Sequence, residues 1–241
     1  MMSKFFYLLI ITLPAVYIFF PTSLPAQITR NDGFVDVNKG LPNSFVQEIP
    51  FIPEGYKGSF YLDENWHTGT ISLHDSALIS DITLRCDLQA DRLEIRLGDG
   101  IRVLPFYQIL AFEYKDETGR HHIFTPANHF KLPDGAPVSG IAEVLFQSEG
   151  IILLAVKTLS LKSANYNVQI DMGERTPEWV QQEKLYFVPG SGKYLIPAKP
   201  GNREEIFGEK TAEVDLWMKQ NQLRFKDKEN LIRVARHFYP D

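Results

Sequence analysis

The chain of 241 residues contains a single cysteine, Cys86. One thiol cannot form an intramolecular disulfide, so the sequence excludes the small folds that depend on disulfide bonds. It also excludes a lipoprotein, because lipid attachment needs a cysteine at the signal cleavage site and Cys86 lies far downstream. The fold must therefore depend on a hydrophobic core. Cys86 shares one alternate face with Ile82, Leu84 and Leu88, and we interpret it as a small buried apolar side chain.

The chain also lacks an excess of basic charge. It has 25 Lys and Arg residues against 30 Asp and Glu residues, a net charge of −5, and the basic residues are scattered among the acidic ones. This distribution predicts no nucleic-acid partner. It also contains no polybasic patch for an anionic membrane surface.

Known catalytic motifs are missing as well. Gly190–Lys193 lacks the first glycine and the final Ser or Thr of a phosphate-binding loop, and Val138–Gly140 lacks the first glycine of a serine-hydrolase motif. His121 and His122 would point to opposite faces of a strand and could not bind one ion together, although His129, in a nearby loop, could approach either. We therefore predict no catalytic residue, no metal site and no cofactor.

The N-terminal region has the layout of a secretory signal peptide. Lys4 precedes an apolar run of 16 residues, Phe5 to Phe20, and the small residue Ala26 follows. A membrane-spanning helix needs about 20 such residues, and Pro14 interrupts this shorter run. We interpret residues 1–26 as a cleaved signal peptide, with an uncleaved N-terminal anchor as the alternative. The mature protein is then periplasmic or extracellular and has no membrane span.

Four segments follow from the changes in composition along the chain. They are the signal peptide at 1–26, an extended leader at 27–57 with one short strand near residues 45–49, a β-rich domain at 58–200, and a C-terminal helical pair at 201–241 packed on that domain. Removing the first 26 residues leaves 215 and changes the net charge to −6, since Lys4 is lost. A chain of this length can bury a substantial core.

Alternating apolar and polar residues predict antiparallel strands. In Arg92–Leu97 the apolar residues Leu93, Ile95 and Leu97 share one face, which is typical of a half-buried strand. Short polar connections such as Asp116–Gly119 favour a meander. The further predicted strands are Thr70–Leu73, Ile82–Leu88, Leu110–Lys115, His122–Thr125, Ala142–Phe146, Ile151–Leu161, Lys184–Val188 and Lys193–Ile196.

Residues 163–182 are polar and predict an irregular segment. Two helices are then predicted, one over residues 203–222 that Gly208 interrupts, and one that Asp227 caps. Strands followed by helices indicate an α+β fold, mainly an antiparallel β-meander that forms an open sheet or a partial barrel, with two C-terminal helices.

The most suggestive group of polar and aromatic residues is Asp63, Glu64 and Trp66. Such a group could form a platform for a sugar ring, whereas the simpler interpretation is a loop whose aromatic residues cover the edge of the sheet. These three residues are weak candidates for a binding site.

Two stretches of the chain resemble a family of uncharacterised exported bacterial proteins. The family has a Gly-Ser-x-Tyr-Leu opening, a β-meander and a C-terminal helical pair. The matching residues are Gly58–Thr70, Leu84–Leu88, Asp91–Glu94, Tyr194–Pro197, Met218–Leu223, Lys228–Leu231 and His237–Tyr239. The resemblance implies export and this fold, and it implies no site residues. In this chain Phe60 replaces a proline of the opening motif.

These observations predict an exported, non-enzymatic envelope protein that acts as a binding or structural module. Its partner would be an envelope protein or a glycan. Two alternatives stay open, namely an envelope glycan hydrolase that uses Asp63 or Glu64, and a carrier of a lipid or another small ligand.

Mass spectrometry of the protein purified from the envelope fraction tests the cleavage site. We expect a mature chain that begins at Gln27. A chain that still carries residues 5–20 would instead show that the N-terminus is an uncleaved anchor.

Overall fold

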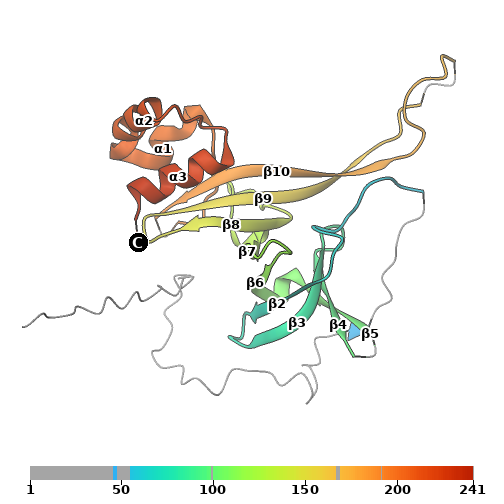
Figure 1. Ribbon diagram of the computed structural model, residues 1–241. Coiled ribbons are helices and arrows are strands. Elements are labelled where there is room, and N and C mark those ends of the chain that lie inside the picture. The colour runs from blue at the N-terminus through green and yellow to red at the C-terminus, as the bar shows by residue number, and fades with distance from the viewer. Residues whose placement is uncertain (1–45, 48–54, 99, 167–168, 191, 241) are drawn as a thin grey trace, which may run out of the picture.

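The computed structural model describes residues 46–47, 55–98, 100–166, 169–190 and 192–240 (Figure 1). The predicted signal peptide and most of the predicted leader lie outside these residues. The described chain forms one antiparallel sheet followed by helices, which confirms the predicted α+β class. Within the described ranges, no helix combines the length and the apolar character that crossing a membrane requires.

The sheet contains eleven strands in the order β1-β5-β4-β3-β2-β6-β7-β8-β9-β10-β11. Their bounds are β1 Val46–Gln47, β2 His67–Leu73, β3 Leu78–Asp87, β4 Arg92–Leu97, β5 Gly100–Pro105, β6 Ile109–Lys115, β7 His121–Pro126, β8 Ile141–Gln147, β9 Ile151–Lys162, β10 Glu178–Pro189 and β11 Ile196–Pro197. β1 lies where the sequence predicts a short strand, and it pairs with β5. β2 is the starting point of two runs, because β3 to β5 extend from one of its edges and β6 to β11 from the other.

The connection between β5 and β6 forces this sheet to bend. In strand order, β4, β3 and β2 lie between these two strands, so a flat sheet would separate them by about 19 Å at a spacing of about 4.8 Å per strand. Only residues 106–108 join Pro105 to Ile109, and four residues of extended chain span at most about 14 Å. The β2–β5 part therefore curls toward β6, as Figure 1 shows.

The bend encloses the larger hydrophobic core. Its side chains come from β2 to β8, and Leu84, Leu93, Leu104 and Phe112 are 1% exposed or less. Cys86 belongs to this core at 3% exposure, as the sequence predicts, and burial raises the pKa of its thiol well above the ordinary value. The curled part of the sheet is therefore filled by side chains.

β5 and β10 differ most from the sequence prediction, while β3 begins at Leu78 and not at Ile82, and β11 covers Ile196–Pro197 where Lys193–Ile196 is predicted. The sequence does not predict β5, because its buried residues Val103 and Leu104 are adjacent and give no alternating pattern. β10 begins at Glu178, whereas the sequence predicts an irregular segment through residue 182. Its first half is polar, and a continuous ladder to β9, from Glu178 opposite Lys162 onward, determines its structure.

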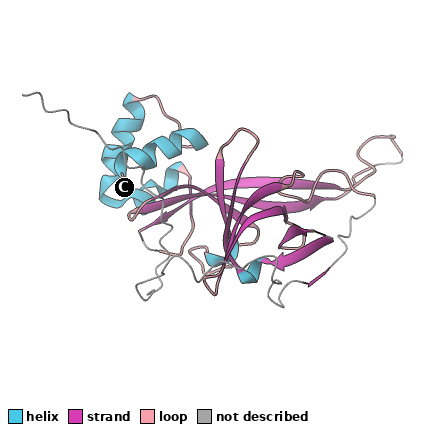
Figure 2. Cartoon of the chain, turned by 60° about the horizontal axis from the view of Figure 1, so that its bottom comes forward, coloured by secondary structure: helices cyan, strands magenta, loops and turns pink. Residues whose placement is uncertain are grey.

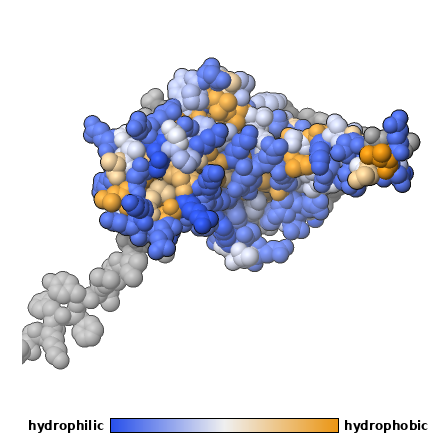
Figure 3. All heavy atoms as spheres, turned by 90° about the horizontal axis from the view of Figure 1, so that it is seen from above, coloured by the Kyte–Doolittle hydropathy of each residue, from blue (hydrophilic) through white to orange (hydrophobic). Residues whose placement is uncertain are grey.

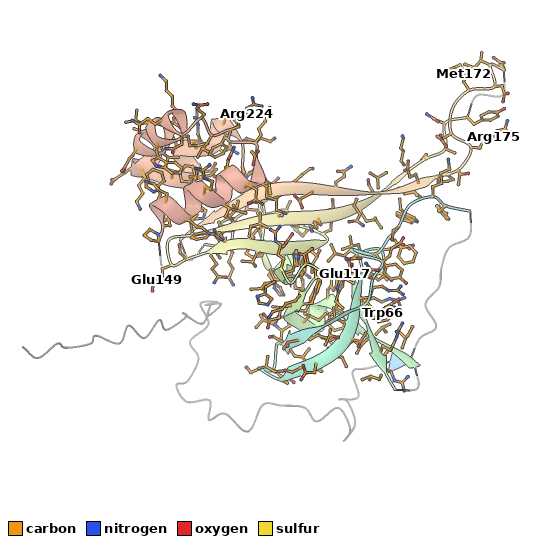
Figure 4. All side chains as sticks on the ribbon, viewed as in Figure 1. Trp66, Glu117, Glu149, Met172, Arg175 and Arg224 are labelled. Carbon is orange, nitrogen blue, oxygen red and sulfur yellow. The ribbon has the colours of Figure 1, made fainter. Side chains whose placement is uncertain are left out.

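The β9–β10 hairpin reaches well beyond the rest of the sheet (Figure 1). Met172 and Arg175 lie near its far end (Figure 4), where Ile170 and Met172 are more than half exposed. The face shown in Figure 3 is mostly hydrophilic, and its hydrophobic residues form small separate groups.

The C-terminal helices gather at one end of the sheet (Figure 2). They are α1 Arg203–Phe207, α2 Thr211–Gln220 and α3 Lys228–Phe238. Gly208, with a φ of 54°, separates α1 from α2 at the predicted interruption. The side chain of Asp227 accepts a hydrogen bond from the Asn230 amide at 3.2 Å and caps α3, also as predicted.

A second core holds these helices on the sheet. Phe187 of β10 is fully buried, and its ring centroid lies 5.5 Å from that of Phe207 and 6.3 Å from that of Phe225. Leu231 and Val234 of α3 complete this core with no exposed surface. Apolar contacts thus fix the helical region against β9 and β10.

The substitution Phe187→Ala should lower the free energy of unfolding by about 3–5 kcal/mol, because it leaves a cavity between sheet and helices. Urea denaturation followed by tryptophan fluorescence measures this loss. The control Leu216→Ala removes a side chain that is 57% exposed, and it should change stability by no more than about 0.5 kcal/mol. Equal effects of the two substitutions would contradict this view of the second core.

Candidate functional site

A groove of about 500 Å³ opens between residues 59–64 and the strands β6, β7, β9 and β10. We call it the central groove. Its lining residues are Ser59, Tyr61, Leu62, Asp63, Glu64, Tyr114, Asp116, His122, Phe124, Lys157 and Gln181. Figure 4 shows the side chains of this region on the ribbon, between the curled strands below and the β9–β10 hairpin above.

One wall of the groove is the segment that leads into β2. The Leu62 amide donates to the Cys86 carbonyl at 2.9 Å, so this segment runs along the end of β3. Asp63 then forms a tight turn, since its Oδ1 accepts from the Asn65 amide and its Oδ2 lies 2.9 Å from His67 Nε2. Glu64 is exposed at the rim, and its carboxylate makes no hydrogen bond or ion pair within the described part of the chain.

The floor of the groove contains Tyr114. Its ring stacks on His67 with centroids 4.1 Å apart and an interplanar angle of 8°, and Phe124 lies on β7 at 5.5 Å. Gly69 of β2 lies opposite it, where a Cβ atom would stand 2.1 Å from the Glu113 carbonyl oxygen. The glycine therefore allows β2 and β6 to approach closely at this point.

The hydroxyl of Tyr114 has no hydrogen-bond partner among the described residues, although the side chain is only 7% exposed. The oxygen is not among the fully buried polar atoms, so it is accessible from the groove. Burial and the nearby carboxylates, chiefly Asp63, raise the pKa of Tyr114 far above its ordinary value, so the phenol is neutral. It presents an unused donor and acceptor to the groove.

His122 connects the groove to the interior of the protein. Its Nε2 lies 3.0 Å from Asp116 Oδ2, and its Nδ1 lies 2.8 Å from Glu143 Oε1. The two carboxylates thus hold the ring through both of its nitrogens. Asp116 also accepts hydrogen bonds from Thr118 and from the Arg120 amide, and these bonds together with His122 lower its pKa.

Glu143 of β8 is the centre of this charged network. It is 4% exposed, and its Oε2 lies 3.0 Å from Lys157 Nζ and 3.5 Å from Lys228 Nζ of α3. Burial opposes its ionisation, but the attraction of Lys157, the hydrogen bond from His122 and the charge of Lys228 outweigh this cost. The pKa of Glu143 consequently falls from 4.5 to about 2.

A second buried network supports the groove wall. Glu94 is fully buried, and its Oε2 accepts from Arg85 Nη2 at 2.6 Å, while its Oε1 accepts from the Tyr61 hydroxyl at 3.2 Å. The Arg85 guanidinium lies 3.7 Å from the centroid of the Tyr61 ring. Gln181 Nε2 donates to the Tyr61 carbonyl at 2.5 Å and joins this wall to β10.

The structure separates the three residues that the sequence selects as weak candidates. Asp63 and Glu64 line the central groove, whereas Trp66 does not. Trp66 lies against two guanidinium groups, with Arg85 at 4.6 Å and Arg96 at 4.4 Å from its ring centroid, and Figure 4 shows it beside β3. These cation–π contacts give the ring a role in packing.

The histidines considered for a metal site lie apart. His121 pairs with Glu113 at 3.1 Å, and His122 belongs to the network of Glu143. His129 instead meets His74, with ring centroids 5.3 Å apart. Within the described residues, no three His, Cys, Asp or Glu side chains are grouped to hold a metal ion.

His129 has a defined tautomer. The Thr125 hydroxyl donates its single proton to the Leu110 carbonyl at 2.9 Å, so His129 Nδ1, 2.8 Å away, must donate to Thr125 Oγ1. Burial, followed by the charges of His74 and Lys193, lowers the pKa of His129 to about 4. This ring is therefore neutral at physiological pH.

Glu143 also lines a second hollow of about 370 Å³, between β7–β8 and α3. Arg120, Arg236 and Glu229 stand at its edge and are exposed. Its opposite charges are balanced, and Glu143, the buried polar residue of its lining, already binds His122, Lys157 and Lys228. The central groove is therefore the stronger candidate.

Sequence reasoning missed most of the groove. Tyr114, Asp116, His122, Lys157 and Gln181 come from four strands and one turn that are distant in sequence. Alternation places Tyr114 on the apolar face of a predicted strand, but a pattern of this kind cannot distinguish a core position from a groove floor.

Comparisons of the chain with protein-family models, with curated proteins and with solved structures found no match. The chemistry of the groove is therefore inferred from its geometry. A glycosidase needs two carboxylates placed about a substrate bond. Here Asp63 and Asp116 accept hydrogen bonds from the protein, and Glu64 is the lining carboxylate without such a bond. The arrangement is suited to binding through hydrogen bonds.

The substitution Glu143→Gln tests the charged network through its pH dependence. A carboxylate whose pKa is lowered on folding stabilises the protein above its unfolded pKa, and this stabilisation is lost as the pH falls from about 4.5 through 2. The variant should be less stable than the wild type by about 3 kcal/mol at neutral pH and should show a shallower loss of stability below about pH 4.5.

Urea denaturation at a series of pH values measures both quantities. The surface variant Glu213→Gln on α2 removes an exposed carboxylate and should keep the wild-type pH profile. An unchanged acid profile in Glu143→Gln would contradict an ionised Glu143 at the centre of the network.

Proposed function

We propose that the protein is an exported, non-enzymatic module of the cell envelope that binds a glycan in the central groove. The single observation that carries the proposal is the Tyr114 hydroxyl, which has no partner in the described residues and is the accessible end of an otherwise buried side chain that lines an open groove. A ligand that hydrogen-bonds to this group would satisfy it.

The other lining residues suit a ligand rich in hydroxyl groups. Ser59, Gln181 and the carboxylates Asp63 and Glu64 offer donors and acceptors along the groove. Its volume of about 500 Å³ falls within the range of about 300–1,000 Å³ for small-ligand sites. Export is supported by the N-terminal sequence and by the resemblance to exported bacterial proteins.

The groove fits glycan binding better than it fits a lipid carrier or a glycan hydrolase. A carrier of a lipid would need an apolar cavity, and the space inside the bend of the sheet is filled by core side chains. A hydrolase would need two carboxylates placed about one substrate bond, and Asp63 and Asp116 are instead bonded to His67 and His122, although both keep lone pairs that can accept from a ligand. An envelope protein remains the second candidate partner, with the groove as its contact surface.

Titration calorimetry of the mature protein with oligomers of N-acetylglucosamine and of glucosamine tests the proposal. We expect at least one of these glycans to bind. Tyr114→Phe should weaken its affinity about fivefold, because one hydrogen bond contributes about 1 kcal/mol. The same variant should fold with wild-type stability, since the hydroxyl has no partner among the described residues.

The exposed variant Glu213→Gln serves as the matched control and should bind as the wild type does. If neither glycan binds at millimolar concentration, or if Tyr114→Phe binds as tightly as the wild type, the proposed function is wrong.

A further inference from the structure

The charges of the central groove are unevenly compensated. Its two basic side chains, His122 and Lys157, both contact the buried Glu143, at 2.8 Å and 3.0 Å. Lys157 also lies 3.9 Å from Glu183. Their positive charge is therefore largely neutralised from within the protein.

The carboxylates that line the groove are all at least partly exposed. Asp63 pairs with His67, and Asp116 pairs with His122 and with the amides of its own turn. Glu64 is the member of this group without an ion pair in the described chain, and it stands exposed at the rim. The opening is consequently negative.

The same carboxylates act on the Tyr114 hydroxyl, which lines the groove and has no partner among the described residues. Besides burial, the charges of Asp63, Glu143 and Asp116 all act to raise the pKa of this phenol. Negative charge thus predominates around the Tyr114 oxygen. This oxygen has no partner among the described residues and belongs to a side chain that is 93% buried. A group that donates hydrogen bonds and carries positive charge fits such a place best.

We propose that the glycan bound in the central groove carries a free ammonium group, as a deacetylated amino sugar does. The ammonium donates to the Glu64 carboxylate and to the Tyr114 oxygen, and neighbouring sugar hydroxyls bind the other polar lining residues. An ammonium has three donors and no acceptor, which matches these two acceptors. An acetylated amine has one donor and no charge, and so it binds less tightly. This inference rests on the proposed function of the groove.

The experiment compares two ligands that differ only at the amine, a glucosamine tetramer and an N-acetylglucosamine tetramer. Both are titrated into the mature protein by calorimetry at mildly acidic pH, where the free amines are protonated. We expect the glucosamine tetramer to bind about tenfold more tightly, which corresponds to one charge-assisted hydrogen bond. Added salt should weaken the binding of this ligand and leave that of the acetylated one nearly unchanged.

Three variants identify the contacts. Glu64→Gln should weaken glucosamine binding about fivefold to tenfold and leave the acetylated tetramer unaffected, because it removes a charge and keeps the shape of the side chain. Tyr114→Phe should weaken both ligands. Glu213→Gln removes a carboxylate from the distant surface of α2 and should affect neither, which separates a local contact from general attraction to an acidic protein.

The outcomes distinguish the inference from the function on which it rests. Equal affinity for the two tetramers, or equal effects of Glu64→Gln and Glu213→Gln, would overturn the ammonium site while the glycan-binding function stands. Binding of neither tetramer would overturn both. Trilysine is the third ligand, and its binding in place of the glucosamine tetramer would show that the ammonium group belongs to a peptide and that a glycan is the wrong ligand.

Discussion

The buried carboxylate of Glu143 is the interaction on which the other parts of the structure depend. It joins β7 through His122, β9 through Lys157 and α3 through Lys228. A charge in such a place is tolerated only when ionic and hydrogen-bonding partners surround it, so its partners are held in one arrangement. The orientation of His122 follows from this requirement, and the contact from Lys228 adds to the apolar packing that holds α3.

The bend of the sheet connects this network to the groove. Three residues between β5 and β6 cannot bridge the width of a flat sheet, so β2–β5 must curl over. The curl brings residues 59–64 opposite β9 and β10, where Gln181 bonds to Tyr61. Most polar groups in the groove have hydrogen-bond or ion-pair partners within the protein. Glu64 and the Tyr114 hydroxyl are the two we assign to a ligand, since neither has a partner among the described residues.

The sequence predicted the elements that local patterns determine, and it missed those that pairing between strands determines. Arg92–Leu97 was predicted with the bounds that β4 has, because its apolar residues alternate, but the predicted polar face is not solvent-exposed throughout, since Glu94 is fully buried. β5 and the first half of β10 were missed, since pairing with neighbouring strands holds them and their own residues show no period. Among the candidate residues Asp63 and Glu64 do line the groove, whereas Trp66 packs on two arginines.

The amino-acid sequence by itself determined the α+β class, the helix ends at Gly208 and Asp227, and the burial of Cys86. All of these depend on residues that are close along the chain, where periodicity and capping act. Only the tertiary structure decided that Tyr114 lies on the floor of a groove without a partner for its hydroxyl in the described chain, and that Glu143 is surrounded by three basic side chains. Those facts depend on distances between strands and a helix far apart in sequence, and no local pattern encodes such distances.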